Sequence, residues 1–219
     1  MSFKIVKQNF DNKEDCSSDI KKKLKEKNIY MINVMGSPGA GKTSLIIELI
    51  DRLRDEFNIA IIEGDIAAQV DAEKIDAEKI PVIQLNLNGA CHIEPTAIRD
   101  VLGFFDLDKI DLIIVENIGN LVCPAEFDIG EDLRIAVLSI PEGDDKIEKY
   151  PLLFSSSEVL VLSKYDIIDY FRFNEEKIIN DMKELNKSFN VFKTSNKTGQ
   201  DFDLLSKYIK NKIKNKNSL

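Results

Sequence analysis

Residues 29–50 read IYMINVMGSPGAGKTSLIIELI, which has the pattern of an apolar strand, a glycine-rich turn and an amphipathic helix. Gly36, Gly41, Lys42 and Thr43 match the phosphate-binding loop pattern G-x-x-x-x-G-K-[ST], in the strand-turn-helix context that this pattern requires. A turn that is rich in glycine by chance would not explain the Lys-Thr pair, because that pair has no packing purpose there. The stretch therefore predicts a P-loop domain that binds a nucleotide.

The residue types of this loop suit a triphosphate. Glycine allows backbone conformations in which successive N–H groups point at phosphate oxygens, and the helix start adds its unpaired N–H groups. We expect Lys42 to contact the β- and γ-phosphates and Thr43 to coordinate Mg²⁺. The residues expected to line the phosphates are Gly36, Ser37, Gly39, Ala40, Gly41, Lys42, Thr43 and Ser44.

Composition narrows the class of protein. The chain has 219 residues, of which 43% are hydrophobic, and this is enough for one α/β domain with a buried core. The formal net charge of -8 argues against a surface for nucleic acid, which would need clustered Lys and Arg. The start lacks the apolar core of a signal peptide, and no apolar run has membrane-spanning length. We therefore expect a cytoplasmic protein with neither nucleic acid nor membrane as a partner.

Short apolar strands alternate with helical patterns along the chain. Strands are predicted over 59–62, 82–85, 112–115, 134–140, 159–162 and 190–194, and helices over 19–27, 43–57, 95–104, 175–186 and 201–213. The segment 67–80 is predicted to be partly helical. This alternation predicts an α/β fold with a mostly parallel sheet that helices cover on both faces. We expect a polar, partly helical segment over 1–28, the P-loop domain over 29–213 and a tail over 214–219.

Carboxylates follow two of the predicted strands. Asp65 lies in Glu63-Gly64-Asp65, and Glu116 lies in Glu116-x-x-Gly119, which resembles the D-x-x-G switch of GTPases with Glu in place of Asp. Such carboxylates hold Mg²⁺ or orient the attacking water, and a glycine N–H can reach the γ-phosphate. The candidate catalytic residues are therefore Lys42, Asp65 and Glu116, and Gly119 is a candidate phosphate contact.

The base is predicted to be guanine. Asp166, in Ser163-Lys164-x-Asp166, occupies the carboxylate position of the N-K-x-D motif, which accepts hydrogen bonds from the N1–H and 2-amino groups of guanine. Ser195-Asn196-Lys197 resembles the S-A-K loop that closes over the base. Each motif alone is equally compatible with an ordinary strand-end turn, but their order after a phosphate loop favours GTP. Serine cannot supply both groups of the usual asparagine amide, so Ser163 predicts weaker guanine affinity.

Cys91-His92 and Cys123 form a second group of candidate residues. Thiolate and imidazole suit Zn²⁺ or Ni²⁺, and three ligands leave a fourth position for water, a backbone group or a second subunit. By residue type alone, buried cysteines and a hydrogen-bonded histidine are equally plausible. Position favours a metal, because both segments follow strand ends. Since Cys123 follows Gly119, we hypothesise that hydrolysis moves one ligand and that the GTP and GDP forms bind metal differently.

Several segments of the chain together resemble those of a known protein family. The segments GSPGAGKTS, EGDIA, NGACHIEP, ENIGNLVCPAEFDIGED, PEGDDKIEKYP and SNKTGQ resemble the hydrogenase nickel-incorporation GTPases, the HypB family, over about residues 29–210. The resemblance implies a P-loop GTPase fold of the SIMIBI class, slow GTP hydrolysis and a homodimer that forms with nucleotide. It also implies nickel delivery to the large-subunit precursor of [NiFe] hydrogenase with a HypA-like zinc and nickel partner.

The resemblance assigns roles to individual residues of the nucleotide site. The family's Mg²⁺ and water-positioning residues match Thr43, Asp65 and Glu116. Its base-reading position matches Asp166, and Lys164 is expected to pack its methylene groups along the guanine. The implied small-molecule ligands are thus GTP or GDP with Mg²⁺.

The family's G-domain metal ligands match Cys91, His92 and Cys123, a site that takes nickel or zinc and that family dimers share across the interface. Some members also carry an amino-terminal C-x-x-C-G-C site or a histidine-rich store. Residues 1–28 hold only Cys16 and no histidine, so we expect no high-affinity nickel site there.

Three other functions remain open from the sequence. A urease-type nickel-delivery GTPase, UreG, would carry a Cys-Pro-His motif that this chain lacks. An ATP-dependent small-molecule kinase would share the phosphate loop but not Asp166 or the Cys-His pair. A nucleotide-gated binding protein without turnover would lack hydrolysis altogether. No catalytic arginine or glutamine is identifiable after Gly119, so we expect slow intrinsic turnover.

Overall fold

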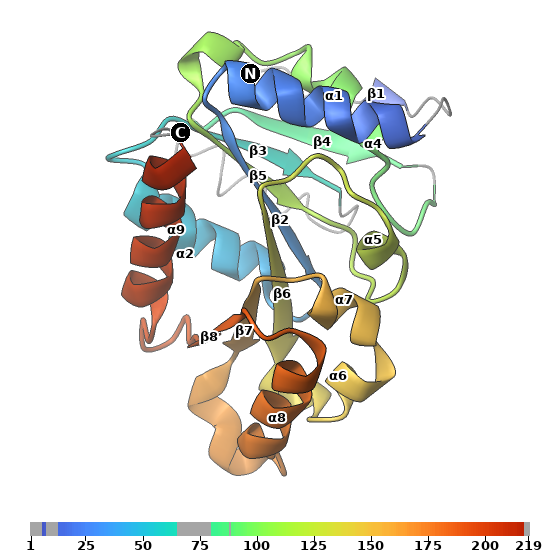
Figure 1. Ribbon diagram of the computed structural model, residues 1–219. Helices are drawn as coiled ribbons and strands as arrows, with labels where there is room; N and C mark the ends of the chain where they lie inside the picture. The colour runs from blue at the N-terminus through green and yellow to red at the C-terminus, as the bar shows by residue number, and fades with distance from the viewer. Residues whose placement is uncertain (1–5, 8–12, 65–79, 88, 217–219) are drawn as a thin grey trace.

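A parallel β-sheet forms the centre of the molecule. The computed structural model describes residues 6–7, 13–64, 80–87 and 89–216 (Figure 1). Within them the strands pair in the order β1-β4-β3-β5-β2-β6-β7-β8, and every pairing is parallel. They are β1 (Val6–Lys7), β2 (Tyr30–Gly36), β3 (Ile59–Glu63), β4 (Val82–Asn86), β5 (Leu112–Glu116), β6 (Leu133–Ser139), β7 (Val159–Ser163) and β8 (Asn190–Lys193). The predicted α/β fold is confirmed.

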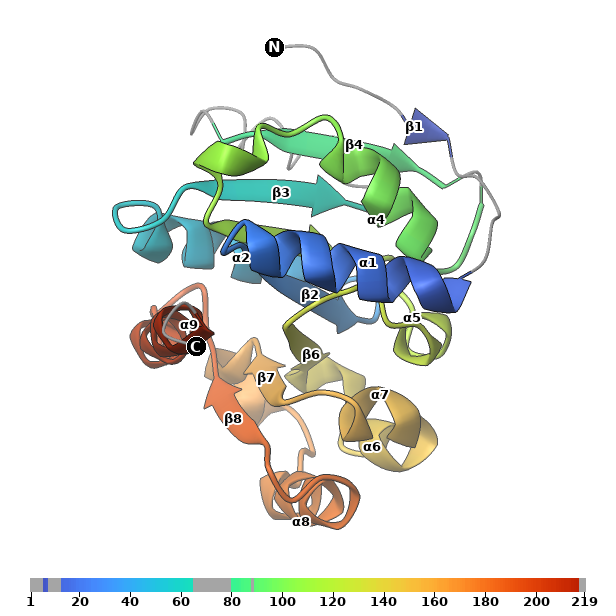
Figure 2. The ribbon, with the colours of Figure 1, turned by 45° about the horizontal axis from the view of Figure 1, so that its top comes forward.

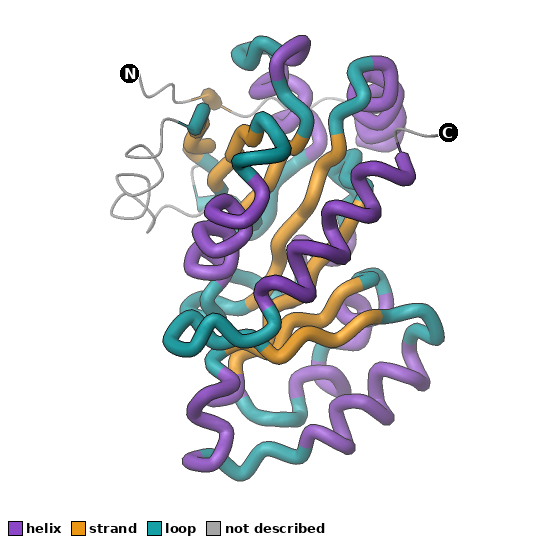
Figure 3. The backbone as a smooth tube through the Cα atoms, turned by 90° about the vertical axis from the view of Figure 1, so that its left-hand side faces the viewer, coloured by secondary structure: helices purple, strands orange, loops and turns teal. Residues whose placement is uncertain are grey.

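Helices cover both faces of this sheet (Figures 2 and 3). They are α1 (Lys13–Glu26), α2 (Lys42–Leu53), α4 (Pro95–Leu102), α5 (Cys123–Glu126), α6 (Lys146–Lys149), α7 (Pro151–Ser155), α8 (Glu175–Leu185) and α9 (Phe202–Lys216). Short 3-10 helices are η2 (Leu107–Lys109), η3 (Ile140–Glu142) and η4 (Tyr165–Tyr170). Among these described helices, none combines the length and the apolar character needed to cross a membrane.

Four helices have a boundary that differs from the prediction by two or more residues. Helix α4 ends at Leu102 and not near 104, and α9 continues to Lys216 and does not end near 213. Helix α1 begins before residue 19, because Cys16 is buried on the same face as Ile20 and Leu24 and extends the apolar stripe by a turn. Helix α2 ends at Leu53, and the N–H of Asn58, immediately before β3, then donates to the carboxylate of Asp111. The partly helical segment predicted over 67–80 lies outside the described residues except for its last position.

Strand β2 divides the core between the two faces. Ile32 and Val34 pack in the apolar cluster that α2 and α9 cover. On the opposite face, Met31 belongs to the cluster under α1 and α4, whereas Met35 belongs to the cluster under α6, α7 and α8. This alternation is what a strand buried on both faces requires.

The carboxyl ends of the parallel strands lie at one edge of the sheet. Gly36, Glu63, Glu116 and Ser163 each end a strand there. The loops that follow these strands are therefore neighbours in space, and this edge is where parallel sheets bind their ligands.

Candidate nucleotide and metal site

The phosphate loop connects β2 to α2. Gly39 and Gly41 have φ angles of 75° and 97°, in the left-handed region that favours glycine. Gly41 is the N-cap residue of α2 and has no side chain with which to cap it. The first N–H groups of α2 are therefore available to an anion, which the helix dipole also favours.

Lys42 holds its ammonium group at this loop. The residue is only 4% exposed, and Nζ donates to the carbonyl oxygens of Ser37 at 3.2 Å and Gly36 at 3.4 Å. A buried cation is costly unless polar or anionic groups surround it. A phosphate group is such a partner, so this position of Lys42 fits the predicted contact.

Thr43 and Glu116 meet at the expected magnesium position. Strand pairing places Val34 opposite Glu116, and Thr43 Oγ1 donates to Glu116 Oε1 at 2.7 Å. Glu63, fully buried at the end of β3, lies in register beside Glu116. A hydroxyl next to two buried carboxylates is a donor set that fits Mg²⁺. Asp65, the other predicted carboxylate, lies outside the described residues.

The segment after β5 touches the phosphate loop. A Cβ on Gly119 would lie 2.7 Å from Pro38 Cγ and 2.9 Å from the Pro38 backbone, so only glycine fits there. Gly36 and Asn120 also form an isolated antiparallel bridge. A change in the phosphate loop therefore directly reaches the residues that lead to Cys123.

The predicted base-reading loops lie together. Asp166 is exposed in η4, and its Oδ1 accepts a hydrogen bond from Ser195 Oγ at 2.7 Å. Asn196 Nδ2 donates to the carbonyl oxygen of Ser44 at 3.0 Å, which ties this loop to the start of α2. Lys197 is exposed in the same loop. The structure thus brings the two predicted motifs together beside the phosphate loop.

Ser163 and Lys164 contact the phosphate loop directly. Ser163 Oγ donates to the carbonyl oxygen of Ala40, and Lys164 Nζ donates to that of Gly39 at 2.8 Å. In the sequence, Ser163 only marks the absence of the asparagine amide of the N-K-x-D motif. The structure adds a second property, because the serine hydroxyl links β7 to the phosphate loop.

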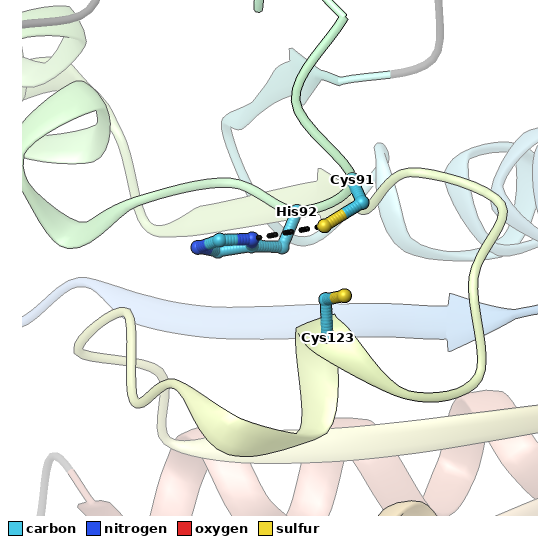
Figure 4. Close-up of side chains that lie close together, drawn as sticks. All are labelled: Cys91, His92 and Cys123. Carbon is cyan, nitrogen blue, oxygen red and sulfur yellow. Dashed lines mark hydrogen bonds between the residues drawn. The ribbon is translucent and has the colours of Figure 1, made fainter.

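Cys91, His92 and Cys123 come together at the same edge of the sheet. Their ligand atoms all lie within 4.8 Å of one another, although the two segments are far apart in the sequence (Figure 4). Cys91 is exposed, and the other two residues are half-buried. Cys123 is the first residue of α5, at the end of the segment that touches the phosphate loop.

Two neighbours fix the ring of His92. Glu94, which is 4% exposed, has Oε1 3.0 Å from His92 Nε2. The ring of Phe127 stacks on the imidazole at 4.1 Å between centroids, with only 5° between the planes. His92 Nδ1 lies 3.6 Å from Cys91 Sγ. Since metal-binding histidines commonly hold their other nitrogen against a carboxylate, this arrangement directs Nδ1 toward the metal position.

The two thiols affect each other. The neighbouring Cys123 side chain raises the pKa of the Cys91 thiol above its usual value, and burial adds to this effect. Two thiolates so close repel each other unless a cation lies between them. Thiolate and imidazole donors suit zinc and nickel, so the residues present fit such an ion.

Comparison with known proteins identifies the family. Residues 30–193 match the profile of the CobW/HypB/UreG nucleotide-binding domain, which is well over half of the chain. The chain belongs to this family. Within the CobW/HypB/UreG family, it is 38% identical over 211 residues to the probable hydrogenase maturation factor HypB of Methanocaldococcus jannaschii. That alignment covers 91% of this chain and 96% of the relative.

Two further relatives agree. The chain is 35% identical over 215 residues to the hydrogenase/urease maturation factor HypB of Helicobacter hepaticus, with 96% of this chain and 88% of that protein covered. Its fold matches the crystal structure of HypB from Helicobacter pylori in complex with nickel, with a TM-score of 0.86 at 30% identity. This match covers 92% of this chain and 95% of that one. The predicted resemblance to HypB and the P-loop fold are both confirmed.

The sequence did not reveal all the residues that shape the site. Glu94 and Phe127 position His92. The sequence offers a signal only for Glu94, which is a carboxylate two residues after the histidine. Phe127 reaches His92 from the loop beyond α5, and nothing in its own sequence neighbourhood indicates this contact.

Proposed function

We propose that this chain is a GTP-hydrolysing metallochaperone that binds nickel or zinc through Cys91, His92 and Cys123 and assists nickel insertion into [NiFe] hydrogenase. The observation that carries the proposal is that two thiol sulfurs and one imidazole nitrogen lie within 4.8 Å of one another. One of the thiols is on the segment that touches the phosphate loop. The relatives support the biological role, since they are named hydrogenase maturation factors and one solved relative is a nickel complex.

The nucleotide roles follow from the residues at the strand ends. Lys42 binds the β- and γ-phosphates, and Thr43, Asp65 and Glu116 hold Mg²⁺ or orient the attacking water. Mg²⁺, when bound, neutralises charge on the phosphates. Asp166 selects guanine, because adenine cannot donate the two hydrogen bonds that its carboxylate accepts. Turnover is slow, since residues 117–132 supply neither an arginine nor a glutamine.

Nucleotide state and metal binding are coupled through the segment after β5. Gly119 lies against Pro38 of the phosphate loop, where its N–H can follow the γ-phosphate. Loss of that contact on hydrolysis shifts the segment and with it Cys123, whereas Cys91 and His92 stay on their own loop. Metal geometry and affinity then change in one step.

The fourth ligand position is the basis for proposing a nucleotide-dependent homodimer. Three protein ligands do not complete a tetrahedral or square-planar site, so a second copy of the chain supplies the missing contact. Val122, next to Cys123, is 49% exposed and offers an apolar contact beside the site. A HypA-like zinc and nickel partner exchanges the ion with this protein, and the hydrogenase large-subunit precursor receives it.

Competition with a chromophoric chelator tests this function. Nickel and zinc affinities are measured in the Mg²⁺-loaded forms with GDP and with a non-hydrolysable GTP analogue, and we expect them to differ by roughly tenfold. Cys123→Ala should abolish the difference, whereas Cys16→Ala, which truncates the buried thiol in α1, should preserve it. Equal metal affinities in the two forms would contradict the proposed coupling.

Simple measurements distinguish this proposal from the other functions that the sequence leaves open. Preference for ATP over GTP in a binding titration would favour a small-molecule kinase, and absence of single-turnover hydrolysis would favour a nucleotide-gated binding protein. Urease is a second candidate client, because the Helicobacter hepaticus relative is named for both enzymes. Nickel transfer from the loaded chain to purified apo-urease or to the hydrogenase precursor distinguishes the two clients.

A further inference from the structure

Buried polar side chains cross one face of the sheet between its two apolar clusters. Asn33 lies on β2 between Met31, which packs under α1 and α4, and Met35, which packs under α6, α7 and α8. Asn33 and Asn117 are fully buried, and Glu131 is only 7% exposed. An apolar residue at position 33 would continue both clusters, so packing alone does not explain an amide there.

The hydrogen bonds through these side chains have one direction. Asn117 Nδ2 donates to Asn33 Oδ1 at 3.1 Å, and Asn33 Nδ2 donates to Glu131 Oε1 at 3.3 Å. Because an ionised carboxylate only accepts, Glu131 fixes the orientation of the Asn33 amide, and Asn33 in turn fixes that of Asn117. Asn117 Oδ1 then accepts from the N–H of Ile118 at 2.9 Å, immediately before Gly119.

Arg134 extends this series of hydrogen bonds to residues 125 and 127, which follow the candidate metal ligand Cys123. Its Nε donates to Glu131 Oε1, while its terminal nitrogens donate to the carbonyl oxygens of Ala125 at 3.3 Å and Phe127 at 2.8 Å. Ala125 lies in α5, whose first residue is Cys123. One guanidinium group therefore binds two backbone carbonyls at the end of α5, shortly after that candidate ligand.

Phe127 connects the same guanidinium to the other half of the metal site. Its ring stacks on His92, so the guanidinium group that binds the Phe127 carbonyl also holds the surface against which the imidazole packs. The hydrogen-bonded series thus begins next to Gly119 at the phosphate loop and ends at residues that position both His92 and Cys123.

We propose that Asn33, Glu131 and Arg134 are positioning residues that transmit the nucleotide state from the segment after β5 to the metal ligands. This inference rests on the proposed function and adds the physical connection that the function needs. When Gly119 gains or loses its phosphate contact, Asn117 rotates and makes or breaks its bond to Asn33. Because Glu131 holds the Asn33 amide in one orientation, the Asn117–Asn33 hydrogen bond is either made or broken, and these are the two discrete states of the connection.

Asn33→Leu tests the connection because it removes both hydrogen bonds with little change in volume. Nickel is titrated against a chromophoric chelator in the GTP-analogue and GDP forms, and the wild-type dissociation constants should differ roughly tenfold. In Asn33→Leu this ratio falls to about one, while affinity for GDP stays within about threefold of wild type. Glu131→Gln gives the same loss, because its amide places a donor against Asn33 or the N–H of Ile129. This second variant decides the question if Asn33→Leu does not fold.

A metal-free readout separates transmission from general loosening. The rate at which iodoacetamide alkylates Cys123 is measured in both nucleotide forms, with the site resolved by peptide mass spectrometry. In the wild type the rates differ between the forms, and in Asn33→Leu and Glu131→Gln they become equal. A merely structural role would change both rates alike and leave their ratio intact, which would contradict the inference.

Asp132→Asn is the matched control. It makes the same carboxyl-to-amide change one residue away, but the Asp132 carboxylate accepts from Met31 N–H and from Lys216, outside the series. We expect it to keep the wild-type ratio, and loss of the ratio in this variant too would overturn the inference. If Asn33→Leu and Glu131→Gln keep the wild-type ratio of nickel dissociation constants, this inference is overturned but the proposed function is not. A wild-type ratio of one overturns the proposed coupling and this inference with it.

Discussion

The phosphate loop and the metal cluster are built in different ways. The loop takes its glycines, Lys42 and Thr43 from one stretch of chain, and its shape follows from the strand-turn-helix unit around it. The cluster joins Cys91 and His92 to Cys123 across the sheet edge, and more distant side chains hold it together. A local site of the first kind keeps its geometry, whereas a site assembled from two loops changes when one loop moves. The proposed function uses this difference, because in it a fixed nucleotide site controls a movable metal site.

The largest expected effect is the loss of nucleotide binding in Lys42→Ala. In the proposed function the Lys42 ammonium group contacts two phosphates, and its removal costs about 4 kcal/mol, which is roughly 1000-fold in affinity for GTP. Nickel affinity without nucleotide should stay within about threefold, because the cluster is built on other loops. Isothermal titration measures both affinities, and Lys22→Ala, an exposed lysine of α1, is the control. A parallel loss of nickel affinity would show that the two sites are not built independently.

Cys123→Ala is the converse experiment. Loss of one thiolate ligand should weaken nickel binding by roughly 100-fold, which is the upper end of what loss of a supporting residue costs. GTP affinity should change by less than about threefold, because Cys123 lies beyond the residues that touch the phosphate loop. Chelator competition gives the nickel constant, and Cys16→Ala shows the effect of removing a buried thiol elsewhere. Unchanged nickel affinity in Cys123→Ala would remove this residue from the metal site.

Glu94→Gln tests whether the metal site depends on a side chain that supports one of its ligands. The carboxylate of Glu94 orients His92 through Nε2, so its neutralisation should weaken nickel binding about 10-fold. Nucleotide affinity should not change. Glu176→Gln, on the exposed face of α8, is the matched control, and the nickel constant is again read by chelator competition. An effect as small as that of Glu176→Gln would mean that the imidazole needs no such orientation.

The smallest expected effect is that of Ser163→Ala, at the end of β7 beside the phosphate loop. Ser163→Ala removes the hydrogen bond to the carbonyl oxygen of Ala40, worth about 1 kcal/mol, and should weaken GTP binding about fivefold. Nickel affinity should be unaffected. Ser206→Ala removes a similar hydroxyl contact within α9 and serves as the control in the same titration. If Ser163→Ala binds GTP as tightly as wild type, the hydroxyl does not hold the loop for its ligand.

The sequence predicted the parts of the molecule whose determinants are local. The strands are short apolar runs, and the phosphate loop is a contiguous motif, so both could be predicted without knowing any long-range contact. The proximity of Cys91-His92 to Cys123 could also be predicted, because both segments follow parallel strands that end at one edge.

The connections between distant segments could not be predicted in this way. Asn33 appears in the sequence only as a polar interruption of an apolar strand, and its partners Asn117 and Glu131 come from other elements. Arg134 is the second residue of the apolar strand β6, and its sequence neighbourhood gives no sign that it holds the residues after Cys123. Such contacts depend on strand order and register, which a single sequence with local patterns does not specify.

Nickel-edge X-ray absorption of the GTP-analogue and GDP forms tests the central claim most directly, because it counts the sulfur ligands of the bound ion in each state. If Cys123 moves with the segment that begins at Glu116 while Cys91 and His92 stay, the number of nickel–sulfur bonds should differ between the two forms. The same number of sulfur ligands at the same distances in both forms would contradict the account.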